Sequence, residues 1–244
     1  MSMHLVPLGV GDAFTARHYS TCLAVEADER WLLIDCPHPI RKMMQESPVE
    51  VDVPTFDAVV LTHLHADHVS GLEGFAYFSH FVLNRPCTLV AHPEVAGPLW
   101  DRHLAVSMEH LIDHQGAALP EKGFADYFHH LPLVEEAKVR VGPFTIECRR
   151  TIHHIPTFAL RVTAGGRTLG HSADTAYDPG LIEWLAGCDL IVHETNYGAH
   201  TPYEKLAALP PMLRERMRLV HYPDDFDVEG SVIEPLRQGR VYVV

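Results

Sequence analysis

The feature that most constrains this chain is a group of histidines placed directly after a buried strand. The apolar residues 58–61 predict a strand with both faces covered, and the chain continues as THLHADH. Helical periodicity follows over residues 69–81, so the histidines lie on a loop between the carboxyl end of a strand and a helix. Such loops commonly carry ligands and catalytic groups.

This short segment offers the imidazoles of His63, His65 and His68 and the carboxylate of Asp67. Four such groups do not fit comfortably around one ion, but alternate residues on a tight loop can face two neighbouring ions. The spacing therefore predicts a pair of metal ions. The motif alone leaves open a plainer interpretation, a polar loop that only faces solvent.

Composition narrows the class of protein. The chain has 244 residues without a linker-like stretch, which predicts a single domain over residues 1–244. A formal net charge of −13 argues against a protein whose main task is to bind long polyanions.

The start MSMHLVPLGV does not resemble a signal peptide, and no apolar window is long enough to cross a membrane, so we expect a cytoplasmic protein without a membrane partner. The cysteines lack a C-x-x-C pair and are expected to be buried thiols: Cys22, Cys36, Cys87, Cys148 and Cys188.

Short strands recur in both halves of the sequence, with helices between them. Strands are predicted at 4–8, 21–26, 31–35, 58–61, 139–141, 144–149, 159–163, 167–169, 190–193, 218–220 and 241–244, and helices at 39–45, 69–81, 181–185 and 212–217. Residues 92–130 show mixed helical patterns. Two strand-rich halves of this kind predict an α+β fold, in which two mixed sheets pack face to face between helical layers.

Three later motifs complete a pattern: TIHHIPTFALRV, GHSADT and LVHYPDDF, in that order. With THLHADH, they resemble the metallo-β-lactamase superfamily, and within it the branch of ribonuclease Z and related phosphodiesterases. The resemblance implies the αββα four-layer sandwich of that superfamily. It spans nearly the whole chain and is weakest over residues 92–130.

Carried over residue by residue, the resemblance implies a complete ligand set for two divalent ions, zinc in the first place, with manganese or iron as alternatives. One ion is bound by His63, His65 and His153, the other by Asp67, His68 and His221, and Asp174 bridges both. The family pattern His-x-Ile-x-x-Phe-x-x-Arg matches His153, Ile155, Phe158 and Arg161, which favours His153 as the ligand. His154 is the weaker candidate, because adjacent side chains on a strand face opposite ways.

The resemblance also implies catalytic roles. The segment His193-Glu194-Thr195 is similar to His-Glu-Ala-Thr of ribonuclease Z, which implies that His193 donates a proton or a hydrogen bond to the reacting phosphate. Asp67 would orient the attacking hydroxide. Ribonuclease Z places a glutamate three residues before its bridging aspartate to orient that histidine, and this chain has His171 there. The short interval between His153 and Asp174 leaves no room for the arm with which ribonuclease Z clamps tRNA, so folded tRNA is not expected as substrate.

The sequence thus predicts a dinuclear metal-dependent hydrolase that cleaves a small or short phosphodiester with a metal-bound hydroxide. A lactone or thioester hydrolase on the same fold is the nearest alternative. From another class, a diiron redox protein or a non-catalytic metal-binding protein stays open. A homodimer also stays open.

Overall fold

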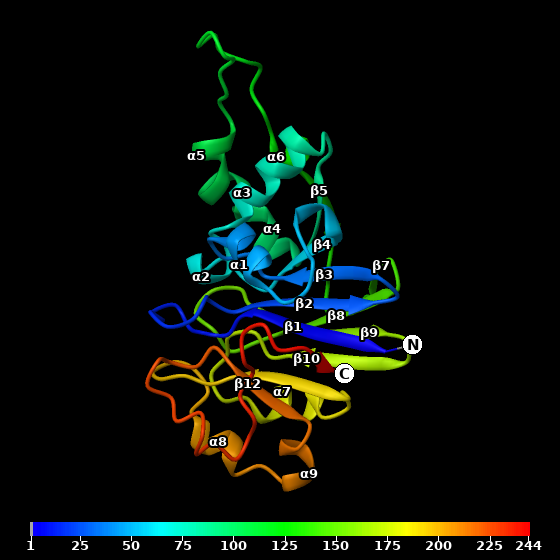
Figure 1. The fold of residues 1–244 in the computed structure, drawn as a ribbon, viewed down its shortest axis with the longest axis vertical. Coiled ribbons are helices and arrows are strands. Elements are labelled where there is room, and N and C mark those ends of the chain that lie inside the picture. Colours follow the sequence, from blue (N-terminus) through cyan, green and yellow to red (C-terminus); the bar gives the residue numbers. More distant parts are fainter. Residues whose placement is uncertain (1) are drawn as a thin grey trace.

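The computed structural model describes residues 2–244, which form two β-sheets packed face to face with helices on both outer sides (Figure 1). The first sheet has the order β13 (Tyr242–Val243), β1 (Met3–Gly9), β2 (Cys22–Ala27), β3 (Arg30–Ile34), β4 (Phe56–Leu61), β5 (Cys87–Ala91), β6 (Phe128–Pro132). The second has the order β12 (Met217–Val220), β11 (Leu190–Glu194), β10 (Arg167–His171), β9 (Phe158–Ala164), β8 (Phe144–Arg150), β7 (Val139–Val141). This arrangement confirms the predicted fold class.

Both sheets are mixed, and in each the antiparallel strands precede the parallel ones in the sequence, except for β13, which pairs antiparallel with β1. Strands β1, β2 and β3 form an antiparallel meander, and β3, β4, β5 and β6 pair in parallel. Strands β7 to β10 are antiparallel, and β10, β11 and β12 pair in parallel. The parallel strands of each sheet therefore direct their carboxyl ends, and the loops that follow them, to one edge.

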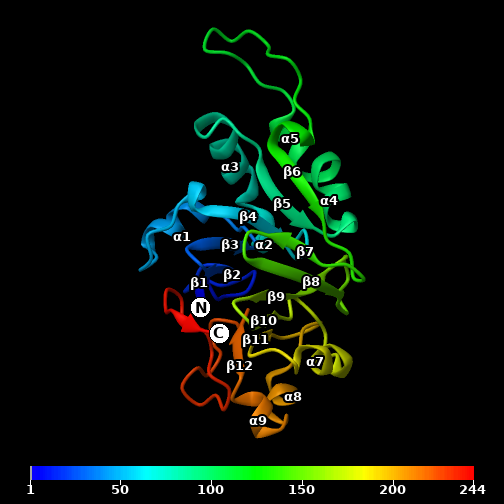
Figure 2. The same ribbon diagram turned by 90° about the vertical axis from the view of Figure 1, so that its right-hand side faces the viewer.

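The helices of each half cover the outer face of their own sheet (Figures 1 and 2). The first half contributes α1 (Ile40–Glu46), α2 (Ala66–Val69), α3 (Leu72–Tyr77), α4 (Pro93–Leu99), α5 (Ala105–Met108) and α6 (Phe124–Tyr127), with a 3₁₀ turn at Val53–Thr55 and π turns at Phe78–Val82 and Trp100–Leu104. The second half contributes α7 (Pro179–Leu185), α8 (Tyr203–Ala207) and α9 (Pro211–Arg214). Residues 109–123, between α5 and α6, project away from the body of the molecule (Figure 1, green).

Two predicted helices differ from the structure, and two observed strands were not predicted. The helix expected over residues 69–81 is divided, because the N–H of Gly71 donates to the carbonyl oxygen of Cys36 and α3 starts afresh at Leu72. The helix expected over 212–217 ends at Arg214, and Met217 already pairs with Ile191 in the second sheet. Strands β5 and β6 were not predicted. Strand β6 is a half-exposed edge strand that carries two histidines, so it lacks the apolar alternation typical of strands.

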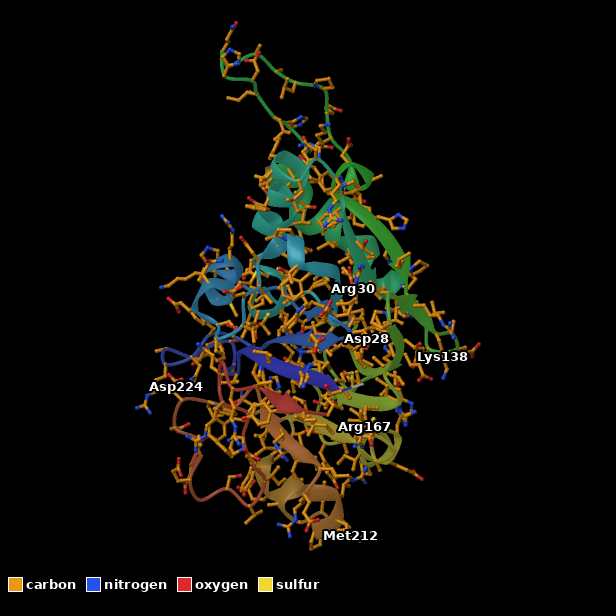
Figure 3. The ribbon with its side chains drawn as sticks, turned by 45° about the vertical axis from the view of Figure 1, so that its right-hand side comes forward. Asp28, Arg30, Lys138, Arg167, Met212 and Asp224 are labelled. Carbon is orange, nitrogen blue, oxygen red and sulfur yellow. The ribbon has the colours of Figure 1, made fainter. Side chains whose placement is uncertain are left out.

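Apolar side chains fill the space between the sheets, and Phe144, Phe158 and Tyr127 are among the largest that are fully buried. All five cysteines are free and buried, as predicted. Arg30 and Arg167 are exposed and are labelled near the middle of the view in Figure 3, and Asp224 is labelled at its left edge. Within residues 2–244, no helix is both long and apolar enough to cross a bilayer.

Candidate metal centre

The residues of the predicted ligand set meet at the edge where the parallel strands end. His63, His65, Asp67 and His68 follow β4, Asp174 follows β10, and His221 follows β12. His153 lies on the loop between β8 and β9. Both sheets therefore contribute side chains to one centre, although the two ends of the set lie far apart in the sequence.

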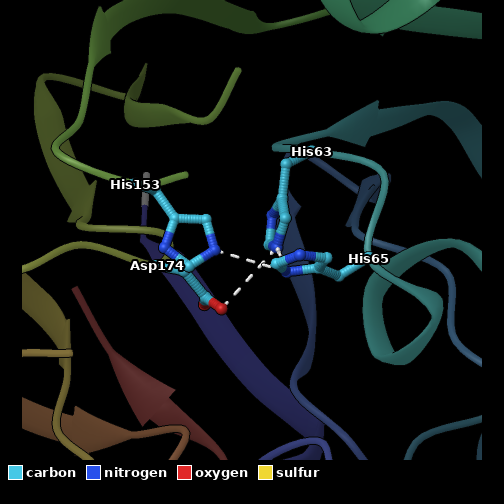
Figure 4. Close-up of side chains that lie close together, drawn as sticks. All are labelled: His63, His65, His153 and Asp174. Atoms are coloured by element: carbon cyan, nitrogen blue, oxygen red, sulfur yellow. Dashed lines mark hydrogen bonds and ion pairs between the residues drawn. The ribbon is translucent and has the colours of Figure 1, made fainter. Parts of the chain in front are cut away.

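A first group of ligand atoms comes from His63, His65, His153 and Asp174 (Figure 4). Nε2 of His63 lies 3.1 Å from Nδ1 of His65, and Nε2 of His153 lies 3.3 Å from the same nitrogen. Oδ2 of Asp174 lies 3.6 Å from Nε2 of His63. Ligand atoms about 2.1 Å from a tetrahedral ion are about 3.4 Å apart, so these spacings fit a zinc-sized cation.

A second group comes from Asp67, His68 and His221. Nε2 of His68 lies 3.3 Å from Oδ2 of Asp67 and 3.4 Å from Oδ1 of Asp174. Nε2 of His221 lies 3.4 Å from Oδ2 of Asp174. The two carboxylate oxygens of Asp174 therefore face both groups, which is the geometry that a bridging ligand needs.

Hydrogen bonds on the far side of three rings leave a lone pair pointing at the centre. The hydroxyl of Thr62 donates to Asp35 at 2.8 Å, so it accepts from Nδ1 of His63 at 2.9 Å. Nδ1 of His68 donates to Asp35 at 2.8 Å. The hydroxyl of Thr21 donates to a backbone carbonyl and accepts from Nδ1 of His221 at 3.2 Å.

In the neutral state each of these rings therefore carries its proton on Nδ1 and presents an unprotonated Nε2, the form in which imidazole binds a metal. Nε2 of His68 and Oδ2 of Asp67 are buried and have no hydrogen-bond partner in the described part of the chain. Buried polar atoms without partners are costly, so an ion between them would satisfy both. The side chains present thus fit a pair of divalent cations.

The pKa values of the clustered side chains also favour the binding of cations at this centre. Asp174 and Asp35 raise the pKa of His68 well above its usual value although burial opposes this, and a position that attracts a proton so strongly also attracts a cation. Burial lowers the pKa of His63 well below its usual value and lowers that of His153 to about 4. Against the effect of burial, His221 and His68 hold the pKa of Asp174 well below its usual value, so it is a carboxylate.

Several residues at this centre have a strained backbone conformation. Asp35, Ala173 and His221 all have positive φ values, of 59°, 49° and 57°. Non-glycine residues in this region cost about 1–3 kcal/mol each and persist where the surrounding structure holds them. Ala173 precedes Asp174, His221 is itself a member of the second ligand group, and Asp35 accepts hydrogen bonds from Thr62 and His68.

Sequence reasoning missed Asp35 and the pair formed by His200 and Glu194. Nδ1 of His200 lies 3.0 Å from Oε1 of Glu194, and a nitrogen of His200 forms a further group of possible ligands with Asp174 and His221. Burial raises the pKa of Glu194 to about 7, and the hydrogen bond to Glu194 raises the pKa of His200 although burial opposes it. The segment Gly198-Ala199-His200, on the loop after β11, carried no spacing that could have revealed this contact.

His193 and His171 belong to none of the three groups of clustered atoms found within residues 2–244. Nδ1 of His193 lies 2.7 Å from the backbone oxygen of Glu194, and burial lowers the pKa values of both histidines to about 4. Both ring nitrogens of His171 are buried without a hydrogen-bond partner in the described chain. His193 therefore has no contact with the ligand set comparable to that of His200.

A cavity of about 400 Å³ lies beside the loops that carry His200 and His221. Its walls include Tyr197, Tyr203 and Phe226, with Glu204 and Asp225 as acidic groups. The amide of Asn196, which also lines the cavity, donates to Asp12 on the first loop at 3.0 Å. A cavity with aromatic walls and a few polar groups suits an organic group of small-molecule size.

Known structures and sequences agree with this description. The chain matches the metallo-β-lactamase fold protein YhfI from Bacillus subtilis with a TM-score of 0.77 and 18% identity, covering 100% of both chains. This likeness shows the metallo-β-lactamase fold, which confirms the fold that the sequence resemblance implied.

Sequence comparisons identify a narrower family within this fold. A family model described as Anti-Pycsar protein Apyc1 matches residues 3–240, so the chain belongs to this family. The Anti-Pycsar protein Apyc1 of Paenibacillus sp. (strain J14) is 30% identical over 259 residues, covering 100% of both chains. A cAMP/cGMP-dependent 3',5'-cAMP/cGMP phosphodiesterase B of Dictyostelium discoideum is 24% identical over 200 residues, covering 74% of this chain and 17% of that protein.

Proposed function

We propose that this chain hydrolyses the phosphodiester bond of a small cyclic nucleotide with the help of two divalent metal ions. The observation that carries the proposal is the position of Asp174, whose two carboxylate oxygens face two separate groups of imidazole nitrogens at 3.4–3.6 Å. The similarity to a protein named as a cAMP/cGMP phosphodiesterase supports the substrate class.

In this proposal His63, His65 and His153 hold one ion, Asp67, His68 and His221 hold the other, and Asp174 bridges them. Nitrogen and carboxylate ligands without a thiolate suit zinc, with manganese or iron as alternatives. When bound, two such ions lower the pKa of a water molecule toward neutrality and polarise the phosphoryl oxygen. Oδ2 of Asp67 faces the second ligand group, so the other oxygen of this carboxylate, Oδ1, would accept a hydrogen bond from the attacking water and orient it.

Two histidines, His200 and His193, are candidates for the proton donor to the leaving oxygen. His200 is held by the buried carboxylate of Glu194 at 3.0 Å and reaches the atoms around Asp174 and His221, which favours it. His193, implied by the likeness to ribonuclease Z, is the alternative, with His171 as the group that would orient it. A third reading makes His200 an additional metal ligand. Metal content and turnover of the single variants separate these roles.

The cavity beside the loops of His200 and His221 supports a substrate with one compact organic group. In a cyclic nucleotide whose phosphate lies at the ions, the base and sugar would extend into the space lined by Tyr197, Tyr203 and Phe226. Ring stacking tolerates any base, and the carboxylates of Glu204 and Asp225 accept hydrogen bonds from hydroxyl or amino groups. The acidic net charge of −13 disfavours long nucleic acids. A homodimer stays a prediction, to be tested by sedimentation of the purified chain.

The decisive experiment combines metal analysis with a substrate panel. Protein purified without added metal is analysed for metal content and tested on cAMP, cGMP, a chromogenic bis-phosphodiester, a lactone and a thioester. We expect two metal equivalents and hydrolysis of the phosphodiesters. Activity on the lactone or thioester alone would favour the alternative hydrolases, and metal binding without any hydrolysis would favour a redox or non-catalytic protein.

A further inference from the structure

His154 makes a contact that the ligand set leaves unused. Its Nε2 lies 2.9 Å from Nε2 of His65, and the two ring centroids are 4.6 Å apart with a tilt of 38°. His154 follows the ligand His153 on the loop after β8, and its side chain is exposed. Two ring nitrogens at this distance require one donor and one acceptor.

The role of the other nitrogen of His65, Nδ1, shows which of the two rings is the donor and which is the acceptor. Nδ1 of His65 lies 3.1 Å from Nε2 of His63 and 3.3 Å from Nε2 of His153, so Nδ1 is the atom that belongs to the first ligand group. A neutral imidazole with its lone pair on Nδ1 carries its proton on Nε2. His65 therefore donates from Nε2, and His154 is the acceptor.

The support of His65 differs from that of the other ligands. His63 and His68 are fixed through the fully buried Asp35, and His221 through the buried Thr21. His65 is half-buried, and its Nε2 has the exposed His154 as its partner. Outer partners of this kind hold the tautomer and the orientation of a metal-binding histidine, and their loss typically weakens metal affinity about 10–100-fold.

We infer that His154 is a positioning residue that holds His65 in the tautomer and orientation required to bind a metal ion. The inference rests on the proposed metal centre and adds to it a residue outside the ligand set. Two other roles are open to an exposed histidine here. Its ring, whose centroid lies 4.5 Å from that of His153, would serve only for packing, or its nitrogen would itself bind an ion.

Three variants separate these roles. His154→Phe keeps a flat ring for packing and removes the acceptor. His154→Gln restores an acceptor, the side-chain amide oxygen, without the ring. His114→Ala, on the exposed segment that projects from the body, serves as the control for removal of a surface histidine. The metal-free form of each is titrated with Zn²⁺ in competition with a chromophoric chelator, and its thermal unfolding is measured without metal.

We expect His154→Phe to bind two equivalents of zinc, with the affinity for one of them reduced about 10–100-fold, and to unfold as the wild type does without metal. His154→Gln should recover most of the affinity, and His114→Ala should match the wild type. Wild-type affinity in His154→Phe, or an equal loss in the Gln variant, would overturn the inference. A single equivalent in His154→Phe would also overturn it, because His154 would then be a ligand. Failure of the wild-type chain to bind zinc would instead refute the proposed metal centre.

Discussion

Replacing Asp35 by asparagine should weaken the binding of one metal ion specifically. Asp35 is fully buried and accepts three hydrogen bonds of 2.8 Å: from the backbone N–H and the hydroxyl of Thr62, and from Nδ1 of His68. Asparagine has nearly the same shape and tolerates the positive φ of 59°. It keeps one acceptor, which the backbone N–H of Thr62 occupies. Its NH₂ group then faces the nitrogen of His68, where an acceptor was.

The consequence follows from hydrogen-bond polarity. Facing an NH₂ group, His68 is stabilised with its lone pair on Nδ1 and its proton on Nε2, which is the wrong form for a ligand. A hydrogen bond to a charged group contributes about 1.5–3 kcal/mol, and each 1.4 kcal/mol is a factor of ten in affinity. We therefore expect the ion held by Asp67, His68 and His221 to bind about 10- to 150-fold more weakly. The ion at His63, His65 and His153 should be less affected, since Thr62 can still contact His63.

Zinc titration against a competing chelator measures the two affinities separately. Asp28→Asn is a matched control, because Asp28 has a similar φ of 54° but is exposed on the turn between β2 and β3. It should bind both ions as the wild type does. If Asp35→Asn bound two equivalents with unchanged affinity, then Asp35 would not set the tautomer of His68, and the argument from outer hydrogen bonds would fail.

Four further outcomes are expected. Asp174→Ala should lose both ions, since this carboxylate faces both ligand groups, and wild-type metal content in this variant would refute the bridging role. His200→Ala should keep two ions and lose about 10²–10⁴-fold in turnover of a phosphodiester, and the loss in His193→Ala should be smaller. A larger loss in His193→Ala, with the His171/His193 double variant equally slow, would assign the role of proton donor to His193. Tyr197→Ala should raise KM for a cyclic nucleotide but leave that for a chromogenic bis-phosphodiester nearly unchanged, and equal effects on both would argue against a base pocket. Removal of the ions with a chelator should lower the midpoint temperature of thermal unfolding. At ion concentrations about 1,000 times Kd, one site adds about 4 kcal/mol to the free energy of unfolding, which corresponds to about 8–16 °C in a chain of this size. An unchanged midpoint would contradict a metal centre in the folded state.

Local sequence predicted much of the architecture. The meander of β1, β2 and β3 follows from short apolar segments separated by turns, and each predicted strand lies within about two residues of the observed one, the accuracy that such boundaries allow. The segment from His63 to His68 indicated a metal pair because its spacing is itself a local property, set on one loop. Strand β6 and the break at Gly71 were missed, since edge pairing and close backbone approach depend on neighbours that a sequence window does not contain. Strand β5, between β4 and β6, was missed although its buried apolar residues are a local signal.

Only the tertiary structure decided how the side chains work together. The family resemblance in the sequence predicted a ligand set of His63, His65, Asp67, His68, His153, Asp174 and His221, which the structure brings together. It could not say which nitrogen of each ring is free. That depends on Asp35, Thr21 and His154, which are brought to the ligands by different strands and loops. The same holds for His200, whose partner Glu194 ends β11. Ring tautomers and proton donors are set by contacts across both sheets, because a hydrogen bond depends on distance in space and not on separation along the chain.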